Sequence, residues 1–214
     1  MPVRLFDTFE WKMLSVGIFL TIILLGLAVF FYTSETETVQ ASAIIFAAHA
    51  FGGRAAGIGL SIMNNFSYLW TIIYNFYLEI LIVCFTYSIS ILSINNYLKF
   101  RVLKYYSRRL ERKAKKHKDK LEKYGGLGLF FFVMAPLPVT GPVVGTIAGK
   151  LLKFSPLKNF SASFLGTLAA TILWTFFFNF LEQNLHIIQY LIIAIFIVVL
   201  VSNTRELKNN LFKK

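Results

Sequence analysis

The stretch that decides the fold is YGGLGLFFFVMAPLPVTGPVVGTIAGKLLKFSP, residues Tyr124–Pro156. It is apolar enough to enter a bilayer, but its centre, Ala135–Pro142, contains three prolines and a glycine. Proline lacks the backbone N–H that a helix needs, and it pushes the preceding residue toward extended geometry. The sequence therefore predicts two half-helices, Leu127–Met134 and Val143–Leu152. A single kinked spanning helix is the alternative.

The length of the two half-helices indicates how they meet the membrane. At 1.5 Å per residue, each half is about 12–15 Å long, which is half of a hydrocarbon core of about 30 Å. The segment is predicted to enter the membrane, turn inside it and leave on the same side. Backbone groups freed at such a turn must be buried in protein or line a wet cavity. The candidate cavity residues are Pro136, Pro138, Thr140 and Gly141. Thr140 is expected either to contribute its hydroxyl to the cavity or only to stabilise the turn.

Composition places the whole chain in the membrane. The protein has 214 residues, of which 57% are hydrophobic and 15% charged, and no polar stretch is long enough for a soluble domain. We therefore expect a single integral membrane domain, residues 1–214. The lone cysteine, Cys84, lies inside an apolar stretch, so we expect neither an intrachain disulfide nor a thiolate metal site.

Four apolar stretches have the length of a transmembrane helix, and a second broken segment lies between the first two. That segment covers residues 41–63 and is interrupted by Gly52 and Gly53. Each glycine destabilises a helix by about 1 kcal/mol relative to alanine. Polar loops are expected at Thr33–Gln40 and Glu182–His186. The predicted spans are Met13–Tyr32, Tyr68–Ile94, Phe160–Leu181 and Ile187–Ser202.

The basic residues predict the orientation. Residues 99–123 contain twelve Lys or Arg and three acids, whereas the loops Thr33–Gln40 and Glu182–His186 contain no Lys or Arg. Because cytoplasmic loops are enriched in Lys and Arg, both termini and a basic helix over residues 95–123 are placed in the cytoplasm. The first broken segment must then enter from outside and the second from inside. This arrangement is an inverted repeat.

The expected fold class is thus an all-α integral membrane protein of the plasma membrane, with multiple passes. It has four spanning helices, two oppositely oriented re-entrant helical hairpins and a basic cytoplasmic helix. The first half is residues 1–94, with the re-entrant segment at 41–63. The second half is residues 124–202, with the re-entrant segment at 124–156, and residues 203–214 form a cytoplasmic tail.

Polar side chains inside apolar segments are the candidate substrate or ion path. Arg54 lies at the first break, where an unpartnered arginine costs at least about 2.5 kcal/mol. It is expected to bind an anionic head group or to clamp nearby carbonyls. Glu79 lies mid-span and requires a basic partner or a proton, and Arg54 is the obvious partner. Asn75, one turn earlier, is expected to bond to Glu79 or to backbone. His49 is either a hydrogen-bonded packing residue or a proton shuttle.

The basic segment is expected to contact anionic lipids of the cytoplasmic leaflet, where each Lys or Arg gains about 1 kcal/mol. A solvated helix that only sets topology is the alternative, and nucleic-acid binding is not expected because no aromatic platform accompanies the charge. Outside this segment, Lys150 is expected to snorkel to the interface. The membrane-surface residues are Arg108, Arg109, Arg112, Lys113, Lys115 and Lys116.

Residues 126–172, GLGLFFFVMAPLPVTGPVVGTIAGKLLKFSPLKNFSASFLGTLAATI, also carry a resemblance. They resemble the second half of the small multidrug export protein family, which pairs a PLPxTG-like turn, here Pro136–Gly141, with a span containing a glycine, here Gly166. That family is similar to the DedA superfamily, whose members have two oppositely oriented re-entrant segments. In the first half such families place an acid beside an arginine, but GGRA at residues 52–55 has only the arginine.

The resemblance implies a transporter, scramblase or flippase that moves a phospholipid or a polyprenyl-phosphate carrier through a cavity between the two broken segments. An ion-coupled exporter of small molecules and a non-transporting membrane scaffold are the alternatives. The expected partners are membrane lipids, and a homo-oligomer is left open. No Ser–His–Asp order, HExxH or CxxC occurs in the sequence. We therefore expect no enzyme activity, metal or cofactor.

Overall fold

The computed structural model describes residues 8–94, 105, 108–109, 111–113, 115, 118–135 and 141–184. All regular elements in these ranges are helices, and these ranges contain no strand. The chain forms two compact units, Met1–Thr175 and Phe176–Lys214. The contacts below are those within the first unit. That the chain is one membrane domain stays a prediction.

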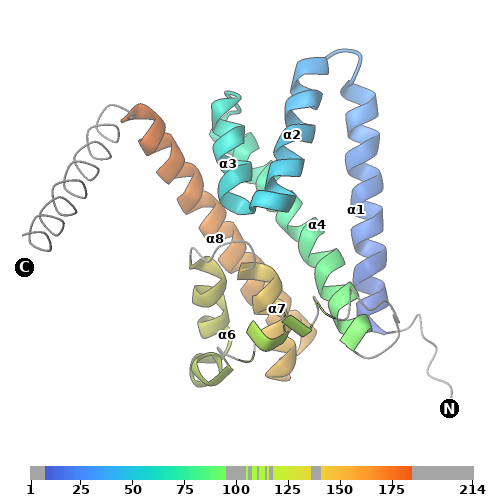
Figure 1. Ribbon diagram of the computed structural model, residues 1–214, viewed down its shortest axis with the longest axis vertical. Helices are drawn as coiled ribbons and strands as arrows, with labels where there is room; N and C mark the ends of the chain where they lie inside the picture. The colour runs from blue at the N-terminus through green and yellow to red at the C-terminus, as the bar shows by residue number, and fades with distance from the viewer. Residues whose placement is uncertain are drawn as a thin grey trace, which may run out of the picture. The chain divides into compact units, whose positions relative to one another are not determined.

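Figure 1 shows the helices of the described residues, labelled in chain order. They are α1 (Phe9–Phe31), α2 (Thr36–Gly52), α3 (Arg54–Met63), α4 (Tyr68–Ile94), α6 (Lys118–Met134), α7 (Gly141–Leu151) and α8 (Pro156–Gln183). Three helices in the described ranges are long and apolar enough to cross a membrane: Phe9–Phe31, Tyr68–Ser93 and Pro156–Gln183. They coincide with the first three predicted spans. The fourth predicted span, Ile187–Ser202, lies outside the described residues.

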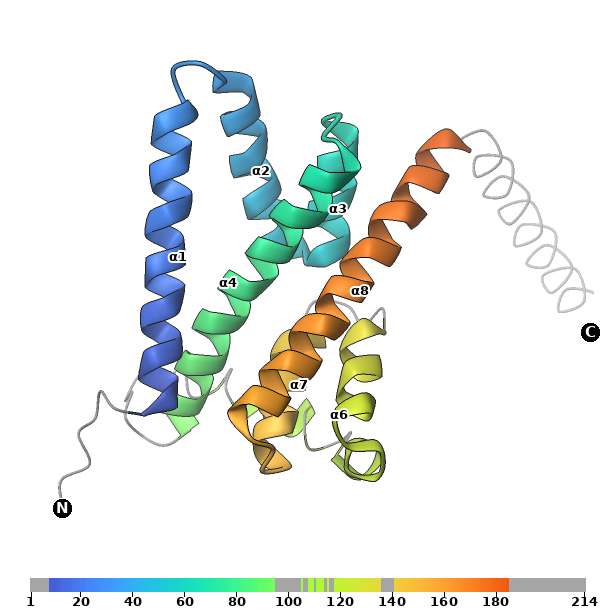
Figure 2. The ribbon, with the colours of Figure 1, turned by 180° about the vertical axis from the view of Figure 1, so that it is seen from behind.

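The first broken segment folds as α2 and α3, which run side by side in opposite directions (Figures 1 and 2). The turn between them is Gly53, with φ 80° and ψ −172°, a conformation that glycine adopts without a steric penalty. The Gly53 N–H donates to the carbonyl of His49 at 3.0 Å, so the end of α2 is capped. The break therefore lies where the paired glycines predict it.

Helix α2 begins earlier than the sequence predicts. The prediction of a polar loop over Thr33–Gln40 is wrong for residues 36–40, which are helical. The Thr36 hydroxyl donates to the carbonyl of Tyr32 at 2.6 Å, and Glu37 lies in the first helical turn, where the helix dipole favours a negative charge. Polar residues at the start of a helix resemble a loop in sequence, but here they stabilise the helix end.

The second broken segment contains α6 and α7, which pack against each other. Helix α6 joins the end of the basic segment to the predicted half-helix across a kink at Gly125, with φ 57° and ψ −133°. Helix α7 starts at Gly141, which places Pro142 in the first turn, where a missing N–H has no cost. Pro136, Pro138 and Thr140 lie outside the described residues. The re-entrant paths and the inverted repeat stay predictions.

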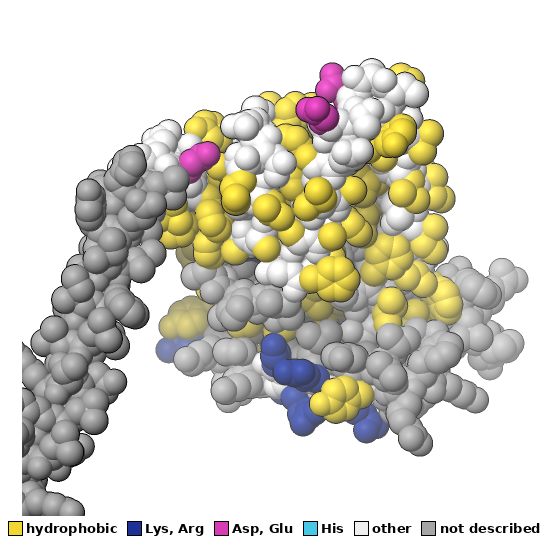
Figure 3. All heavy atoms as spheres, turned by 45° about the horizontal axis from the view of Figure 1, so that its top comes forward, with side chains coloured by type: hydrophobic (Ala, Val, Ile, Leu, Met, Phe, Trp, Pro, Cys, Tyr) yellow, Lys and Arg dark blue, Asp and Glu magenta, His cyan; other side chains and the backbone are white. Residues whose placement is uncertain are grey.

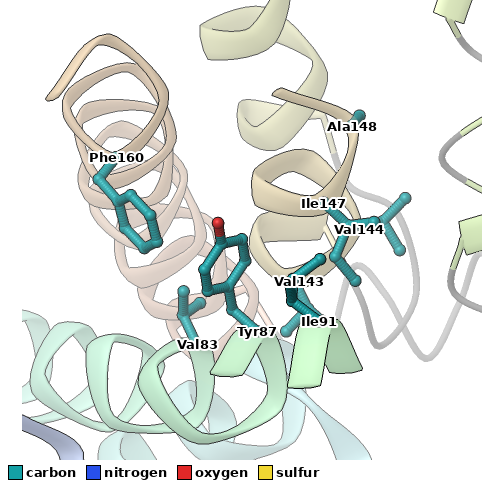
Figure 4. Close-up of a cluster of buried hydrophobic side chains, with 8 residues drawn as sticks. All are labelled: Val83, Tyr87, Ile91, Val143, Val144, Ile147, Ala148 and Phe160. Atoms are coloured by element: carbon teal, nitrogen blue, oxygen red, sulfur yellow. The ribbon is translucent and has the colours of Figure 1, made fainter. Parts of the chain in front are cut away.

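A cluster of buried hydrophobic side chains joins α4 to α7 and to the start of α8 (Figure 4). The ring of Tyr87 on α4 meets the ring of Phe160 on α8 edge to face, with centroids 5.0 Å apart. Phe9 of α1 adds a third ring, 5.4 Å from that of Phe160. The buried members of the cluster are Val83, Tyr87, Ile91, Val143, Val144, Ile147, Ala148 and Phe160.

Polar contacts fix α1 and α2 against the later helices. On α4, the hydroxyl of Tyr77 donates to the carbonyl of Leu20, and that of Tyr74 donates to the carbonyl of Ser42 at 2.8 Å. Lys150 at the end of α7 donates to Glu10 in the first turn of α1, with 2.6 Å between Nζ and Oε1. The sequence predicts that Lys150 snorkels to the interface. Its side chain is 46% exposed, and it also forms this ion pair.

The outer surface is apolar over much of its height. Val29 and Phe30 on α1 are 75% and 74% exposed, as expected for side chains that face lipid tails. Figure 3 shows one face of the molecule, with apolar side chains over its upper part, acidic side chains near its upper edge, and Lys and Arg near its lower edge. This distribution is that of an integral membrane protein.

Close packing of α8 on α6 leads to the first prediction. A Cβ at Gly166 would come 2.5 Å from the carbonyl oxygen of Phe130 and 3.2 Å from Cβ of Val133. Gly166→Ala is therefore expected to reduce the free energy of unfolding in detergent by about 1–3 kcal/mol through overpacking. Gly26→Ala on α1 is the control, because nothing lies within 4 Å of its Cβ. Equal thermal stability of the two variants would contradict this packing.

Candidate functional site

The two charged residues that the sequence places at membrane depth form an ion pair. Arg54 is the first residue of α3, and Glu79 lies in the middle of α4. The Nε atom of Arg54 donates to Oε1 of Glu79 at 2.9 Å. The side chains are only 10% and 8% exposed, so both charges are largely buried. Each group therefore depends on the other for its stability.

His49, in the last turn of α2, lies against the same carboxylate. Its Nε2 atom is 3.6 Å from Oε1 of Glu79. The other ring nitrogen, Nδ1, is 2.9 Å from Oδ1 of Asn75. The imidazole is thus held between an amide and a carboxylate that are one turn apart on α4. Because Arg54 and His49 both lie close to the same carboxylate oxygen, α2, α3 and α4 all contribute to one buried cluster.

Asn75 is held by a second set of contacts. Its Nδ2 atom donates to the hydroxyl of Ser61 at 2.8 Å and to the carbonyl of Thr71 at 2.9 Å. The Ser61 hydroxyl donates in turn to the carbonyl of Gly57 at 2.9 Å. Asn75, Ser61 and Thr71 are fully buried. The predicted bond of Asn75 to backbone is present, and its side chain contacts His49 rather than Glu79.

A glycine on α3 provides the space for this network. A Cβ at Gly57 would lie 2.5 Å from Oδ1 of Asn75 and 2.5 Å from Nδ1 of His49. Real Cβ atoms do not approach other atoms so closely, so a side chain at this position would displace the imidazole or the amide. Gly57 therefore permits the backbone of α3 to lie directly against the histidine–asparagine pair.

Part of the arginine remains available to a ligand. Within the described part of the chain, the guanidinium bonds through Nε, and its two terminal amino groups make no hydrogen bond. A guanidinium can bind a phosphate or carboxylate through two parallel hydrogen bonds. The cluster as a whole offers a positive group, a negative group and an imidazole in a medium of low polarity. It can hold a charged ligand group or a proton.

Of the predicted path residues, the structure brings together Arg54, Glu79, Asn75 and His49. Gly141 is buried at the start of α7, and the contact described for it is packing: a Cβ there would lie 3.3 Å from the carbonyl oxygen of Val133. Pro136, Pro138 and Thr140 lie outside the described residues, so their place beside the cluster stays a prediction.

The predicted surface residues are exposed where the structure describes their side chains. Arg108, Arg109, Arg112, Lys113 and Lys115 are exposed, and Lys116 lies outside the described residues. Lys115 pairs with Glu111 at 2.7 Å, four residues earlier in the sequence. An exposed pair of this kind contributes only about 0.3–0.5 kcal/mol.

The described residues contain no group of three or more His, Cys, Asp or Glu side chains placed to hold a metal ion. Three residues of the site were not predicted: Gly57, Ser61 and Thr71. The sequence pattern that could have identified them is a spacing of four residues, which places side chains on one face of a helix. Gly57 and Ser61 are four apart on α3, and Thr71, Asn75 and Glu79 follow one another at intervals of four on α4, so each set lies along one helix face.

Comparison with known proteins finds one family. A family model described as "Putative small multi-drug export protein" matches residues 54–173. No curated protein and no solved structure matches the chain. The matched residues begin at Arg54 and include Asn75 and Glu79, and they extend well before the part of the chain that carries the resemblance in sequence.

The buried pair leads to a prediction for stability. Arg54→Ala or Glu79→Ala alone leaves one buried charge without a partner and is expected to cost about 3–5 kcal/mol of unfolding free energy. The double variant is expected to lose less than the sum, with a coupling energy above about 1 kcal/mol in a double-mutant cycle. A second cycle on Glu111 and Lys115 is the control and should give about 0.3–0.5 kcal/mol. Equal coupling energies in the two cycles would contradict the inference that burial strengthens the Arg54–Glu79 interaction.

Proposed function

This chain belongs to the family of small multi-drug export proteins, and from that membership we propose that it is a transporter whose substrate binds at the Arg54–Glu79 pair. The observation that carries the proposal is the burial of this pair at the turn between two short helices. Ionisable groups inside a membrane are costly and mark substrate or ion pathways. Interrupted helices near the midplane form the binding sites of many transporters.

The substrate class that we favour is a lipid with a phosphate group, either a phospholipid or a polyprenyl phosphate. Arg54 supports this choice, because its terminal amino groups are not used by described residues and match the geometry of a phosphate. The exposed basic side chains of residues 108–115 would attract the same lipids at the membrane surface. In this mechanism the phosphate displaces part of the Arg54–Glu79 contact while it passes.

A drug is the second candidate, because the family description names multi-drug export, and a cationic drug would suit the site. Here Glu79 is the binding group, since a buried carboxylate attracts an organic cation that displaces Arg54. The two candidates place opposite demands on the same pair. A phosphate needs the guanidinium, whereas a cation needs the carboxylate.

We further propose the orientation that the basic residues predict. Both termini and the basic segment face the cytoplasm of a plasma membrane, and the α1–α2 turn faces outside. The pairs α2–α3 and α6–α7 are then re-entrant segments that enter from opposite sides as an inverted repeat. The exposed Lys and Arg of residues 108–115 support this orientation, as does the absence of Lys and Arg from residues 33–40.

Transport is tested in liposomes that contain the purified full chain, with a fluorescent phospholipid, a fluorescent polyprenyl phosphate or a cationic dye as substrate. If a phosphate is the ligand, Arg54→Lys should slow lipid movement about tenfold, because lysine keeps the charge but loses the paired hydrogen bonds. Glu79→Gln should leave a larger share of lipid transport intact. If a cation is the ligand, Glu79→Gln should abolish dye transport.

Gly26→Ala is the control for the assay, since Gly26 is exposed on α1 and a Cβ added there would meet no other part of the structure within 4 Å. It should transport at the wild-type rate. Movement of all three probes at the rate of empty vesicles would overturn the transporter and favour a membrane scaffold.

Orientation is tested with a membrane-impermeant maleimide in intact cells. Cys84 is buried and is the only cysteine in the sequence, so Cys84→Ser gives a background without thiols. Thr36→Cys at the start of α2 is expected to be labelled from outside, and Arg112→Cys only after permeabilisation. Labelling of both positions from the same side would contradict the inverted repeat.

A further inference from the structure

The two ring nitrogens of His49 have different partners. Nδ1 is 2.9 Å from Oδ1 of Asn75, whereas Nε2 is 3.6 Å from Oε1 of Glu79. The imidazole is almost completely buried, at 2% exposure. Nε2 is itself buried and makes no hydrogen bond to any described residue. The proton on each nitrogen therefore depends on the atoms that surround the ring.

Asn75 determines the state of Nδ1. Its Nδ2 group donates to the carbonyl of Thr71, which can only accept, and to the hydroxyl of Ser61, which already donates to Gly57. The amide oxygen is therefore the atom that faces His49. An amide oxygen accepts hydrogen bonds and cannot donate them, so Nδ1 must carry a proton.

With Nδ1 protonated, a neutral imidazole has a bare lone pair on Nε2. That lone pair would face a carboxylate oxygen, which is also an acceptor, in a buried site. Two acceptors in contact repel each other, and a proton between them removes the repulsion. We propose that Nε2 of His49 and Oε1 of Glu79 form a proton-binding site that takes up and releases one proton. On binding, the proton forms an N–H or O–H bond directed at the other atom, and no other bond changes.

The neighbouring groups define the charge of the site. Among the described residues, the charged or titratable groups that face His49 are Glu79 on α4 and Arg54 on α3. Tyr74 on α4 also approaches α2, but its hydroxyl is bonded to the carbonyl of Ser42. Without the shared proton the three side chains of Arg54, Glu79 and His49 sum to zero charge, and with it they carry one positive charge.

This inference deepens the proposed function by naming a proton as the coupling ion, and it rests on that function for its role in transport. The protonated site has an excess positive charge that favours an anionic phosphate, and the unprotonated site favours an organic cation at Glu79. The proton site itself does not depend on transport. His49 precedes the residues that the family model matches, so the match does not supply this group.

The site is tested by NMR on the full chain in lipid nanodiscs, with isotope-labelled histidine. The chain has three histidines, so His117→Gln with His186→Gln leaves His49 as the single signal. Across a pH series, Nδ1 is expected to stay protonated, because the amide oxygen of Asn75 can only accept a hydrogen bond. One proton is expected to leave the Nε2 side of the ring or the Glu79 carboxyl. A neutral ring with the proton on Nε2, or the absence of any titration, would overturn the proposal.

Two variants separate the proton site from general damage to the fold. Glu79→Gln removes the acid with little change in shape, and the shared proton is expected to be lost. Asn75→Leu removes the acceptor at Nδ1, and both neutral forms of the ring are expected. An unchanged His49 spectrum in Glu79→Gln would overturn the site. Since no substrate is used, failure of transport in liposomes leaves this result intact.

Discussion

The hydrogen bond from Arg54 to Glu79, at 2.9 Å, is the constraint on which the first half of the structure depends. Neither charge is stable alone at membrane depth, because a lone charge there costs several kcal/mol. The first residue of α3 must therefore lie level with the middle of α4. This is achieved by ending α2 inside the apolar zone and reversing the chain at Gly53. If residues 41–63 formed one continuous helix, the chain would not reverse at Gly53, and Arg54 would not be placed beside Glu79 in this way.

Packing around this pair uses small residues and internal hydrogen bonds. Helices in lipid gain little from the hydrophobic effect, so close backbone approach and polar contacts hold them together. Gly57 lets α3 approach His49 and Asn75, and Gly166 lets α8 approach α6. On α8, the buried hydroxyls of Thr167, Thr171 and Thr175 donate to carbonyls four residues earlier. These polar groups satisfy one another within the helix and need no partner from lipid.

The sequence predicts the helices well because apolar length and glycine are local signals. The break at Gly53 and the bounds of α4 agree with the prediction, whereas α2 extends into a polar stretch that resembles a loop. Polar and charged residues in apolar segments likewise predict four of the seven residues of the site: Arg54, Glu79, Asn75 and His49. Gly57, Ser61 and Thr71 do not stand out, since small and hydroxyl residues are common in membrane helices. The Glu10–Lys150 pair joins residues 140 positions apart, and only the folded chain brings them together.

The arrangement also separates the tasks of the three helices. Arg54 on α3 and Glu79 on α4 form the charge pair, whereas α2 contributes His49, which lies near the same carboxylate oxygen. In the proposed mechanism, a proton on His49 would weaken the hold of Glu79 on Arg54, because the carboxylate would then divide its attraction between two cations. Arg54 would then be free to bind an anionic ligand. In this proposal, the coupling of proton and substrate comes from two cations that share one carboxylate oxygen.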